Sequence, residues 1–145
     1  MEYWDTSSLV KLYAPEFDSE RFIRRVEQQS VLCTSSVALT ELPVSLLRKA
    51  HEKVLSPRDA DSLIRSFRED CAGGRIELVP YHSRVALEAE RIVRLALNAT
   101  PPRMVRSLDL IHAASALSMD ADTFVATDTR LKDIIRLLGI RLFPE

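Results

Sequence analysis

Short apolar runs alternate with longer amphipathic segments along almost the whole chain. Five of the apolar runs have the length of buried strands, namely residues 2–4, 31–35, 76–79, 123–127 and 140–143. The segments between them place apolar residues three or four positions apart, a spacing that is typical of helices with one face on a core. Strands separated by helices of this length need crossover connections. The pattern therefore predicts an α/β fold with a mostly parallel sheet of four to five strands.

Capping and breaking residues set the limits of the predicted helices. Ser56 and Pro57 form a cap and a first turn, and Gly73 and Gly74 end the helix that follows. Pro43 lies within another helical segment; because proline is tolerated only in a first turn, that helix either begins near residue 40 or kinks at the proline. The other helices are expected at residues 8–14, 17–29, 37–52, 83–98, 107–117 and 129–138.

Composition and charge limit the class of protein. A chain of 145 residues with 46% hydrophobic content is expected to form one domain, residues 1–145. The 20 Lys and Arg residues nearly balance the 21 Asp and Glu residues, so nucleic-acid binding would need a local basic patch. No segment is apolar for long enough to span a bilayer, and the first ten residues lack the features of a signal peptide. We therefore expect a cytoplasmic protein that does not bind membranes.

Four acidic residues adjoin the predicted boundaries between strands and helices. Asp5, Asp109 and Asp128 each lie where a short apolar run gives way to a helix, and Glu41 lies just beyond another such run. If the runs are neighbouring parallel strands, their carboxyl ends meet at one edge of the sheet, where open α/β folds bind ligands. Carboxylate oxygens are preferred ligands of Mg²⁺, and a cation would relieve the repulsion between clustered acids. The acids therefore indicate a site for a divalent metal.

A purely structural explanation of the same four acids is equally open at this point. All of them fall near predicted helix N-termini, where an acidic side chain caps free backbone amides and interacts favourably with the helix dipole. Capping alone would account for each of them. The two explanations differ in what they require of the fold, because only the metal site needs the four carboxylates to lie at one edge of the sheet.

Other phosphate-handling sites leave signatures that the chain lacks. Its three glycines do not cluster after a strand, which excludes the phosphate-binding loop and the dinucleotide fingerprint. An aspartyl-phosphate enzyme would carry a second acid two residues after its nucleophile, whereas Asp5 is followed by Thr6 and Ser7. Cys33 and Cys71 have neither the spacing of a zinc site nor that of a redox pair, and we expect both to be reduced.

Four segments around the acids resemble, in the same order, the signature blocks of the PIN domain, and most closely those of VapC-type toxin ribonucleases. The segments are residues 5–16, 34–42, 107–117 and 124–131. Each block alone is a weak signal, but the four together span essentially the whole chain. The resemblance implies a PIN-like three-layer fold, in which helices flank a mostly parallel central sheet.

The same resemblance implies a Mg²⁺-dependent endoribonuclease, with Mn²⁺ as a substitute metal. Asp5, Glu41, Asp109 and Asp128 would hold the metal and activate the water that hydrolyses an RNA phosphodiester bond. The protein would be the toxin of a toxin–antitoxin pair and would form a homodimer. A cognate antitoxin would lie in an apolar groove and reach the acids with a basic side chain. Two alternatives stay open: a housekeeping PIN nuclease in RNA processing, and a PIN-like interaction module without catalytic activity.

Several polar residues near the acids have both a functional and a structural interpretation. Ser7 and Thr127 could contact the acids or the scissile phosphate, although a serine in this position also caps helices. Arg130, Arg103 and Arg106 flank the acidic segments and could bind phosphate oxygens, which match the fork of a guanidinium group. A solvated surface charge is an equally good explanation for each arginine.

His112 stands three residues after Asp109 and shares its face of the predicted helix. A histidine in an apolar helix is more often packed and hydrogen-bonded than catalytic. We therefore expect RNA cleavage not to require His112 as an acid or a base. Tyr3 and Trp4 are expected in the core.

Overall fold

The structure, a computed structural model, describes residues 1–29 and 31–145. Five strands form its sheet: β1 (Glu2–Trp4), β2 (Leu32–Ser35), β3 (Ile76–Val79), β4 (Thr123–Val125) and β5 (Arg141–Phe143). The helices of the described residues are α1 (Thr6–Tyr13), α2 (Ser19–Val26), α3 (Ala38–His51), α4 (Pro57–Ala72), α5 (Ser83–Asn98), α6 (Ser107–Ser118) and α7 (Thr129–Leu137). The predicted alternation of strands and helices is confirmed. None of these helices is long and apolar enough to cross a membrane.

All five strands run parallel, in the order β3-β2-β1-β4-β5. The central strand β1 pairs on both sides, since Tyr3 is in register with Cys33 of β2 and with Phe124 of β4. Because the strands are parallel, the ends of β1, β2 and β4 lie at one edge of the sheet, and the segments that follow them begin there. The predicted α/β fold with a parallel sheet is thus confirmed, and the sheet has five strands.

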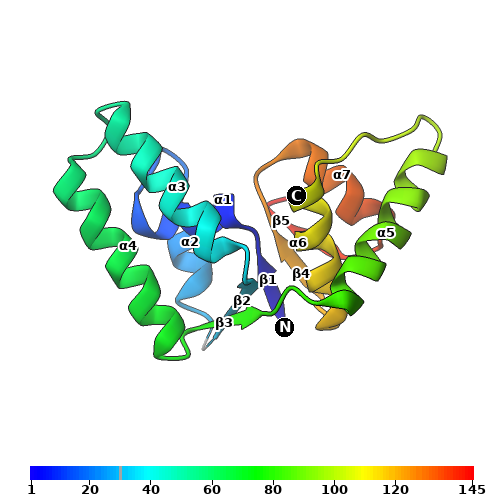
Figure 1. The fold of residues 1–145 in the computed structure, drawn as a ribbon, viewed down its shortest axis with the longest axis horizontal. Coiled ribbons are helices and arrows are strands. Elements are labelled where there is room, and N and C mark those ends of the chain that lie inside the picture. The colour runs from blue at the N-terminus through cyan, green and yellow to red at the C-terminus, as the bar shows by residue number, and fades with distance from the viewer. Residues whose placement is uncertain (30) are drawn as a thin grey trace.

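Neighbouring residues of the central strands face opposite helical layers. Tyr3 and Phe124 stack at 5.0 Å between ring centroids and belong to a core that includes side chains of α5, α6 and α7. Trp4 and Val125 belong to a second core, built with α1 to α4. Figure 1 shows the two groups of helices on either side of the strands. The alternation of side chains along a strand therefore produces the three layers.

Two features differ from the sequence-based expectation. Asp109 does not follow a strand; it lies in the first turn of α6, which the irregular loop of residues 99–106 joins to α5. Pro101 and Pro102 lie in this loop, and prolines cannot donate to a strand ladder, so no strand forms before α6. Helix α3 begins at Ala38, so Pro43 lies inside it; of the two alternatives for this helix, the start near residue 40 is wrong.

Candidate active site

Asp5 and Asp128 are positioned by the two adjacent central strands. Asp5 follows β1 and caps α1, since its Oδ1 accepts a hydrogen bond from the backbone N–H of Ser8 at 2.8 Å. Asp128 follows β4 and caps α7, with its Oδ1 accepting from the N–H groups of Arg130 and Leu131 at 2.9 and 3.1 Å. Both aspartates are therefore helix caps, and both lie at the same edge of the sheet. The capping and the metal-binding explanations are compatible.

Two hydroxyl groups connect the segments that carry these aspartates. The hydroxyl of Ser7 donates to Oδ2 of Asp5 at 2.6 Å and lies 2.9 Å from the hydroxyl of Thr127. Thr127 immediately precedes Asp128, so this contact joins the end of β1 to the end of β4. Ser7 is not the cap of α1, because Asp5 takes that position.

Glu41 lies in the first turn of α3 and is held by residues from two other helices. Its Oε2 accepts a hydrogen bond from the hydroxyl of Thr6 at 2.6 Å and lies 2.7 Å from Nε2 of His112. The Thr6 hydroxyl is itself 3.2 Å from Nε2 of His112. On its other side, the histidine ring meets the hydroxyl of Tyr3, at 2.7 Å from Nδ1. Helices α1, α3 and α6 are thus joined at one point.

Asp109 reaches the same edge from α6, one turn before His112 on the same helix face. Burial raises the pKa of Asp109, and the negative charge of Asp128 raises it further. Asp109 is therefore within electrostatic range of Asp128. The four predicted acids therefore gather at one edge of the sheet, although Asp109 arrives there from a helix rather than from a strand.

The fold shifts the pKa values of these carboxyl groups in different directions. Burial raises the pKa of Asp5, despite the opposing hydrogen bonds from Ser7 and Ser8. Burial also raises the pKa of Glu41, but the hydrogen bond and charge of His112 and the hydroxyl of Thr6 outweigh this effect, so that the net shift is downward. Asp5 and Asp109 thus have carboxylates whose charge the fold disfavours, and Glu41 has one whose charge it supports.

The raised pKa of Asp109 predicts a pH-dependent effect of Asp109→Asn on stability. In the metal-free protein, this carboxyl holds its proton to higher pH when folded than when unfolded, so ionisation destabilises the folded state as pH rises through its ordinary value of about 3.9. Asparagine cannot ionise. In EDTA, the variant should be more stable than the natural protein at pH 7, and this advantage should disappear near pH 3. Urea unfolding at a series of pH values measures it, and an advantage that grows toward low pH would contradict a raised pKa as the cause.

The geometry leaves carboxylate oxygens available for a cation. No group of three or more His, Cys, Asp or Glu side chains within residues 1–29 and 31–145 converges closely enough to hold a metal ion by itself. The hydrogen bonds of Glu41 and Asp128 to described residues involve only Oε2 and Oδ1, respectively. Mg²⁺ usually keeps several waters and binds through one or two carboxylates and phosphate oxygens. The oxygen donors present, together with the disfavoured charges of Asp5 and Asp109, fit such a cation.

The three arginines that flank the acidic segments have different surroundings in the structure. Arg130 meets Asp128 through its backbone N–H, and its side chain is exposed. Arg103 lies 3.5 Å from Asp133 in an ion pair, away from the four acids. Arg106, the residue that precedes α6, acts on Asp109 electrostatically and lowers its pKa. Of these three arginines, Arg106 is the one whose positive charge lowers the pKa of Asp109.

Two contacts near the acids were not predicted from the sequence, namely that of Thr6 with Glu41 and that of Tyr3 with His112. Thr6 follows Asp5 directly, and its place in the first turn of α1 is a local signal that could have drawn attention to it. Tyr3 was correctly predicted to be buried, but its hydroxyl contact with His112 joins residues 109 positions apart. No local sequence signal indicates a contact over that distance.

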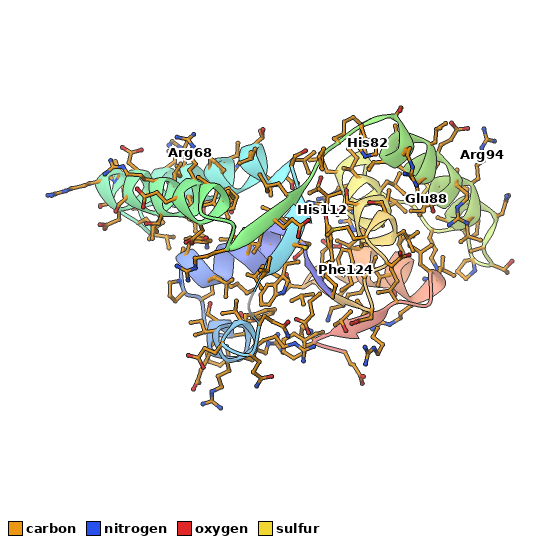
Figure 2. All side chains as sticks on the ribbon, turned by 90° about the horizontal axis from the view of Figure 1, so that it is seen from below. Arg68, His82, Glu88, Arg94, His112 and Phe124 are labelled. Carbon is orange, nitrogen blue, oxygen red and sulfur yellow. The ribbon has the colours of Figure 1, made fainter. Side chains whose placement is uncertain are left out.

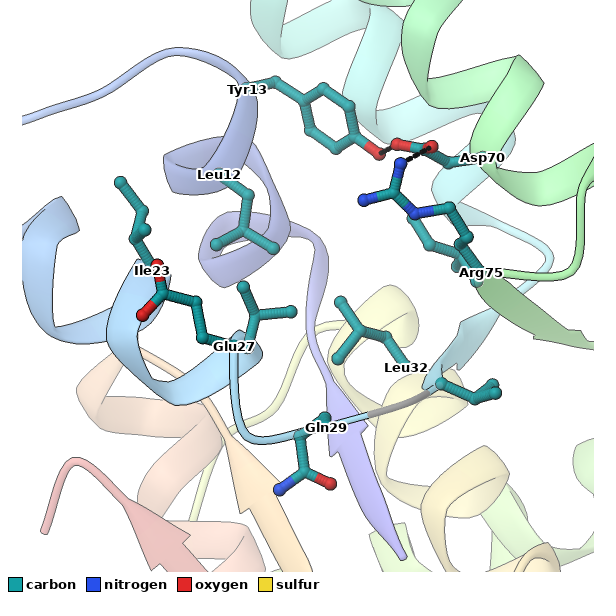
Figure 3. A pocket seen from close by; sticks show the side chains of 11 residues that line it. Leu12, Tyr13, Ile23, Glu27, Gln29, Leu32, Asp70 and Arg75 are labelled. Carbon is teal, nitrogen blue, oxygen red and sulfur yellow. Dashed lines mark hydrogen bonds and ion pairs between the residues drawn. The ribbon is translucent and has the colours of Figure 1, made fainter.

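None of the four acids lines a separate hollow of about 470 Å³, whose side chains are shown in Figure 3. It is lined by the last residues of α1 and the first residues of β2 and β3, whereas the acids follow strand ends. On one side, the hydroxyl of Tyr13 donates to Asp70, which also pairs with Arg75 at 3.1 Å. The hollow is mostly apolar, with side chains that include Leu12 and Leu32.

Comparison with known proteins decides the family. The sequence profile of the PIN-domain family matches residues 3–137, which is nearly the whole chain. This chain belongs to the PIN-domain family. Among curated proteins, none matches it significantly.

Solved structures with the same fold include components of toxin–antitoxin systems. The structure of FitAcB from Neisseria gonorrhoeae is 17% identical, with a TM-score of 0.69 over 98% of this chain and 96% of that one. VapBC2 from Rickettsia felis, bound to a DNA fragment from its promoter, is 18% identical, with a TM-score of 0.66 over 98% and 97%. VapC20 from Mycobacterium tuberculosis, a toxin that cleaves the sarcin–ricin loop, is 16% identical, with a TM-score of 0.68 over 92% and 94%. At these identities, the likeness establishes the PIN fold.

Proposed function

We propose that this PIN domain is a Mg²⁺-dependent endoribonuclease that hydrolyses RNA phosphodiester bonds. The observation that carries the proposal is the placement of Asp5 and Asp128 after the adjacent strands β1 and β4, with Glu41 and Asp109 in the first turns of α3 and α6. The charge of Asp128 acts on Asp109, and Glu41 is hydrogen-bonded to Thr6 and His112. Membership of the PIN family supports it, because these acids lie in the segments that resemble the family's signature blocks. Helix capping explains Asp5 and Asp128, and the helix dipole favours Glu41 and Asp109 in their first turns, but neither effect requires Asp109 to lie where Asp128 raises its pKa.

The chain's own residues would prepare the site in three ways. Asp5, Asp109 and Asp128 would hold the metal, with Glu41 as a fourth ligand. When bound, Mg²⁺ supplies a Lewis acid that promotes attack by water and stabilises the negative charge that develops on the phosphate. Ser7 and the backbone N–H of Ser8 fix both oxygens of the Asp5 carboxylate. Arg106 and Arg130 lie beside the acids in the chain, and we assign them to RNA phosphates, which their planar guanidinium groups match.

The proposed biological role is that of a toxin controlled by an antitoxin. The structures with the same fold include FitAB and VapBC2 complexes, each bound to DNA. An antitoxin segment would cover an apolar surface of this protein and place a basic side chain near the acids. The protein itself would form a homodimer. Exposed apolar side chains on α3 and α5 offer surface for such contacts, namely Leu39, Val44, Leu47, Leu87, Leu95 and Leu97.

One observation favours a second candidate, a PIN-like interaction module without catalytic activity. Among the described residues, no three His, Cys, Asp or Glu side chains lie close enough together to hold a metal ion. A module of this kind would bind a partner through its surface and would show neither metal binding nor RNA cleavage. The nuclease remains the better-supported function, because a module has no need to place Asp109 where the charge of Asp128 disfavours its ionisation.

RNA cleavage with defined chemical ends tests the proposal. Attack by water on phosphorus does not need the RNA 2′-hydroxyl, so the products should carry 5′-phosphate and 3′-hydroxyl ends. Cleavage should be abolished by EDTA and restored by Mg²⁺ or Mn²⁺, and His112→Ala should retain partial activity. Mass spectrometry of the fragments identifies the ends. Cyclic-phosphate ends, or cleavage in EDTA, would overturn the mechanism; metal-loaded protein that cuts no RNA would favour the interaction module.

A further inference from the structure

Four polar side chains, those of Tyr3, His112, Glu41 and Thr6, form a continuous hydrogen-bonded network. It runs from Tyr3 in β1 to His112 in α6 and then to Glu41 in α3, with Thr6 of α1 as a second contact to Glu41. Tyr3 is completely buried and only 3% of His112 is exposed, so the bond between them is shielded from water, whereas Glu41 is only partly buried. Figure 2 shows His112 in the interior near Phe124, whereas His82 lies by the start of α5 at the molecular periphery.

The Glu41 carboxylate decides which groups donate in the hydrogen bonds that it makes with His112 and Thr6. The Glu41 carboxylate can only accept, so Nε2 of His112, at 2.7 Å, must carry a proton and donate. In the neutral tautomer that donates from Nε2, Nδ1 has a free lone pair and accepts from the Tyr3 hydroxyl, whose oxygen lies 2.7 Å away. The opposite tautomer would place the Nε2 lone pair against the carboxylate. Both the histidine and Thr6 therefore donate to Glu41, and the tyrosine sets the tautomer that makes the histidine a donor.

The two donors converge on one oxygen of Glu41. Thr6 and His112 both bind Oε2, at 2.6 and 2.7 Å, and no described residue donates to Oε1. Oε2 is thereby held from two directions, while Oε1 receives no hydrogen bond from a described residue. Metal-ligating carboxylates are commonly held by hydrogen-bonding groups outside the metal's own ligands.

We propose that Tyr3, His112 and Thr6 form a positioning relay that orients Glu41 so that its Oε1 is presented to the divalent cation. The inference rests on the proposed metal-dependent function and deepens it. His112 touches neither the substrate nor the metal in this role; it acts through Glu41. Glu41 belongs to the layer of α1 to α4, whereas His112 belongs to the layer of α5 to α7, so the relay also fixes the two layers to each other at the site.

A double-mutant cycle on Mn²⁺ binding tests the relay, with calorimetry as the measurement. His112→Ala should weaken Mn²⁺ binding by about 10- to 100-fold, the usual effect of removing a group that orients a metal ligand. In a Glu41→Gln background, the same change should alter affinity by no more than about twofold, because the histidine then has no carboxylate to orient. Equal losses in both backgrounds, or no loss in the natural protein, would overturn the proposal.

Conservative variants separate positioning from general support of the fold. The amide of His112→Gln can still donate to Glu41 and should recover Mn²⁺ affinity to within about threefold of the natural protein. Tyr3→Phe keeps the ring but removes the hydroxyl, and should weaken binding by about two- to tenfold, as expected for one hydrogen bond. These two variants keep the test decisive if His112→Ala does not fold. The matched control, His51→Gln on the exposed end of α3, should change nothing. A glutamine variant that recovers nothing would overturn the relay.

Two further readouts distinguish failure of the relay from failure of the proposed function. In metal-free protein, ¹⁵N NMR of the imidazole should show the proton on Nε2 of His112, and Tyr3→Phe should perturb that signal; a proton on Nδ1 alone would overturn the relay. Coupling of His112 to Glu41 without any RNA cleavage would uphold the relay and remove the nuclease. EDTA-sensitive RNA cleavage without coupling between His112 and Glu41 would support the nuclease and overturn the relay. Natural protein that binds no Mn²⁺ would overturn the relay, since Glu41 would then have no cation to face.

Discussion

Asp109→Asn is expected to lower the rate of RNA cleavage by about a thousandfold or more while leaving the metal-free fold intact. A neutral amide is a poorer ligand than a carboxylate, and a metal's contribution to charge stabilisation of several kcal/mol corresponds to rate changes of this size. The fold should survive because Asp109 is a partly exposed residue in a first helical turn, whose burial and proximity to Asp128 already disfavour its charge. Initial cleavage rates of a defined RNA, together with unfolding curves in EDTA, measure both effects.

The control for this experiment is Asp61→Asn, which makes the same chemical change on an exposed position of α4. It should leave both the cleavage rate and the stability unchanged. If Asp109→Asn instead loses several kcal/mol of stability and keeps its activity, then Asp109 serves the fold and not the chemistry. The capping explanation of the acids would in that case be the correct one.

Millimolar Mn²⁺ is expected to raise the melting temperature of the natural protein by about 5 to 10 °C. A ligand that binds only the folded state stabilises it by about 2.7 kcal/mol at a hundredfold excess over its Kd, and a domain of this size gains roughly 2–4 °C per kcal/mol. The gain arises because a cation offsets the charges that burial disfavours on Asp5 and Asp109. Differential scanning calorimetry with and without Mn²⁺ measures the shift.

Asp5→Asn should remove most of this shift while retaining the cap of α1, since asparagine caps a helix about as well as aspartate. Its melting temperature in EDTA should therefore equal or exceed that of the natural protein. Ca²⁺ at the same concentration provides a comparison of ion size and coordination. A melting curve of the natural protein that does not respond to Mn²⁺, with no heat of binding in calorimetry, would count against any metal site at this edge.

The order of the elements was accessible from sequence because it depends on local signals. Ser56 and Pro57 do start α4, with Ser56 capping the N–H of Asp59, and Gly73 ends it. The short apolar runs became strands, and β1, β2 and β4 are buried at every position, as expected for strands covered by helices on both faces. Asp5 and Asp128 were correctly predicted to follow strands, because Asp5 directly follows β1 and Asp128 lies just beyond β4. These predictions needed no knowledge of which strands are neighbours.

The gathering of the acids was predicted on a partly wrong premise. The sequence pattern predicted Asp109 after a strand, whereas α6 brings it to the sheet edge from the loop of residues 99–106. Helix packing, rather than a strand end, decides its position: α6 lies against α5 and β2, and this fixes the direction in which its first turn faces. Local patterns do not encode that orientation, because it depends on apolar side chains from several elements packing together.

The sequence by itself determined that the chain folds as alternating strands and helices, and it identified four acids as candidate metal ligands. Only the tertiary structure decided that His112 meets Glu41, 71 positions away, and that both connect to Tyr3 and Thr6. The contact depends on the strand order β3-β2-β1-β4-β5, which places β1 between the two helical layers. Periodicity and capping act over a few residues, whereas strand order and the packing of layers arise from the burial of apolar surface across the whole chain.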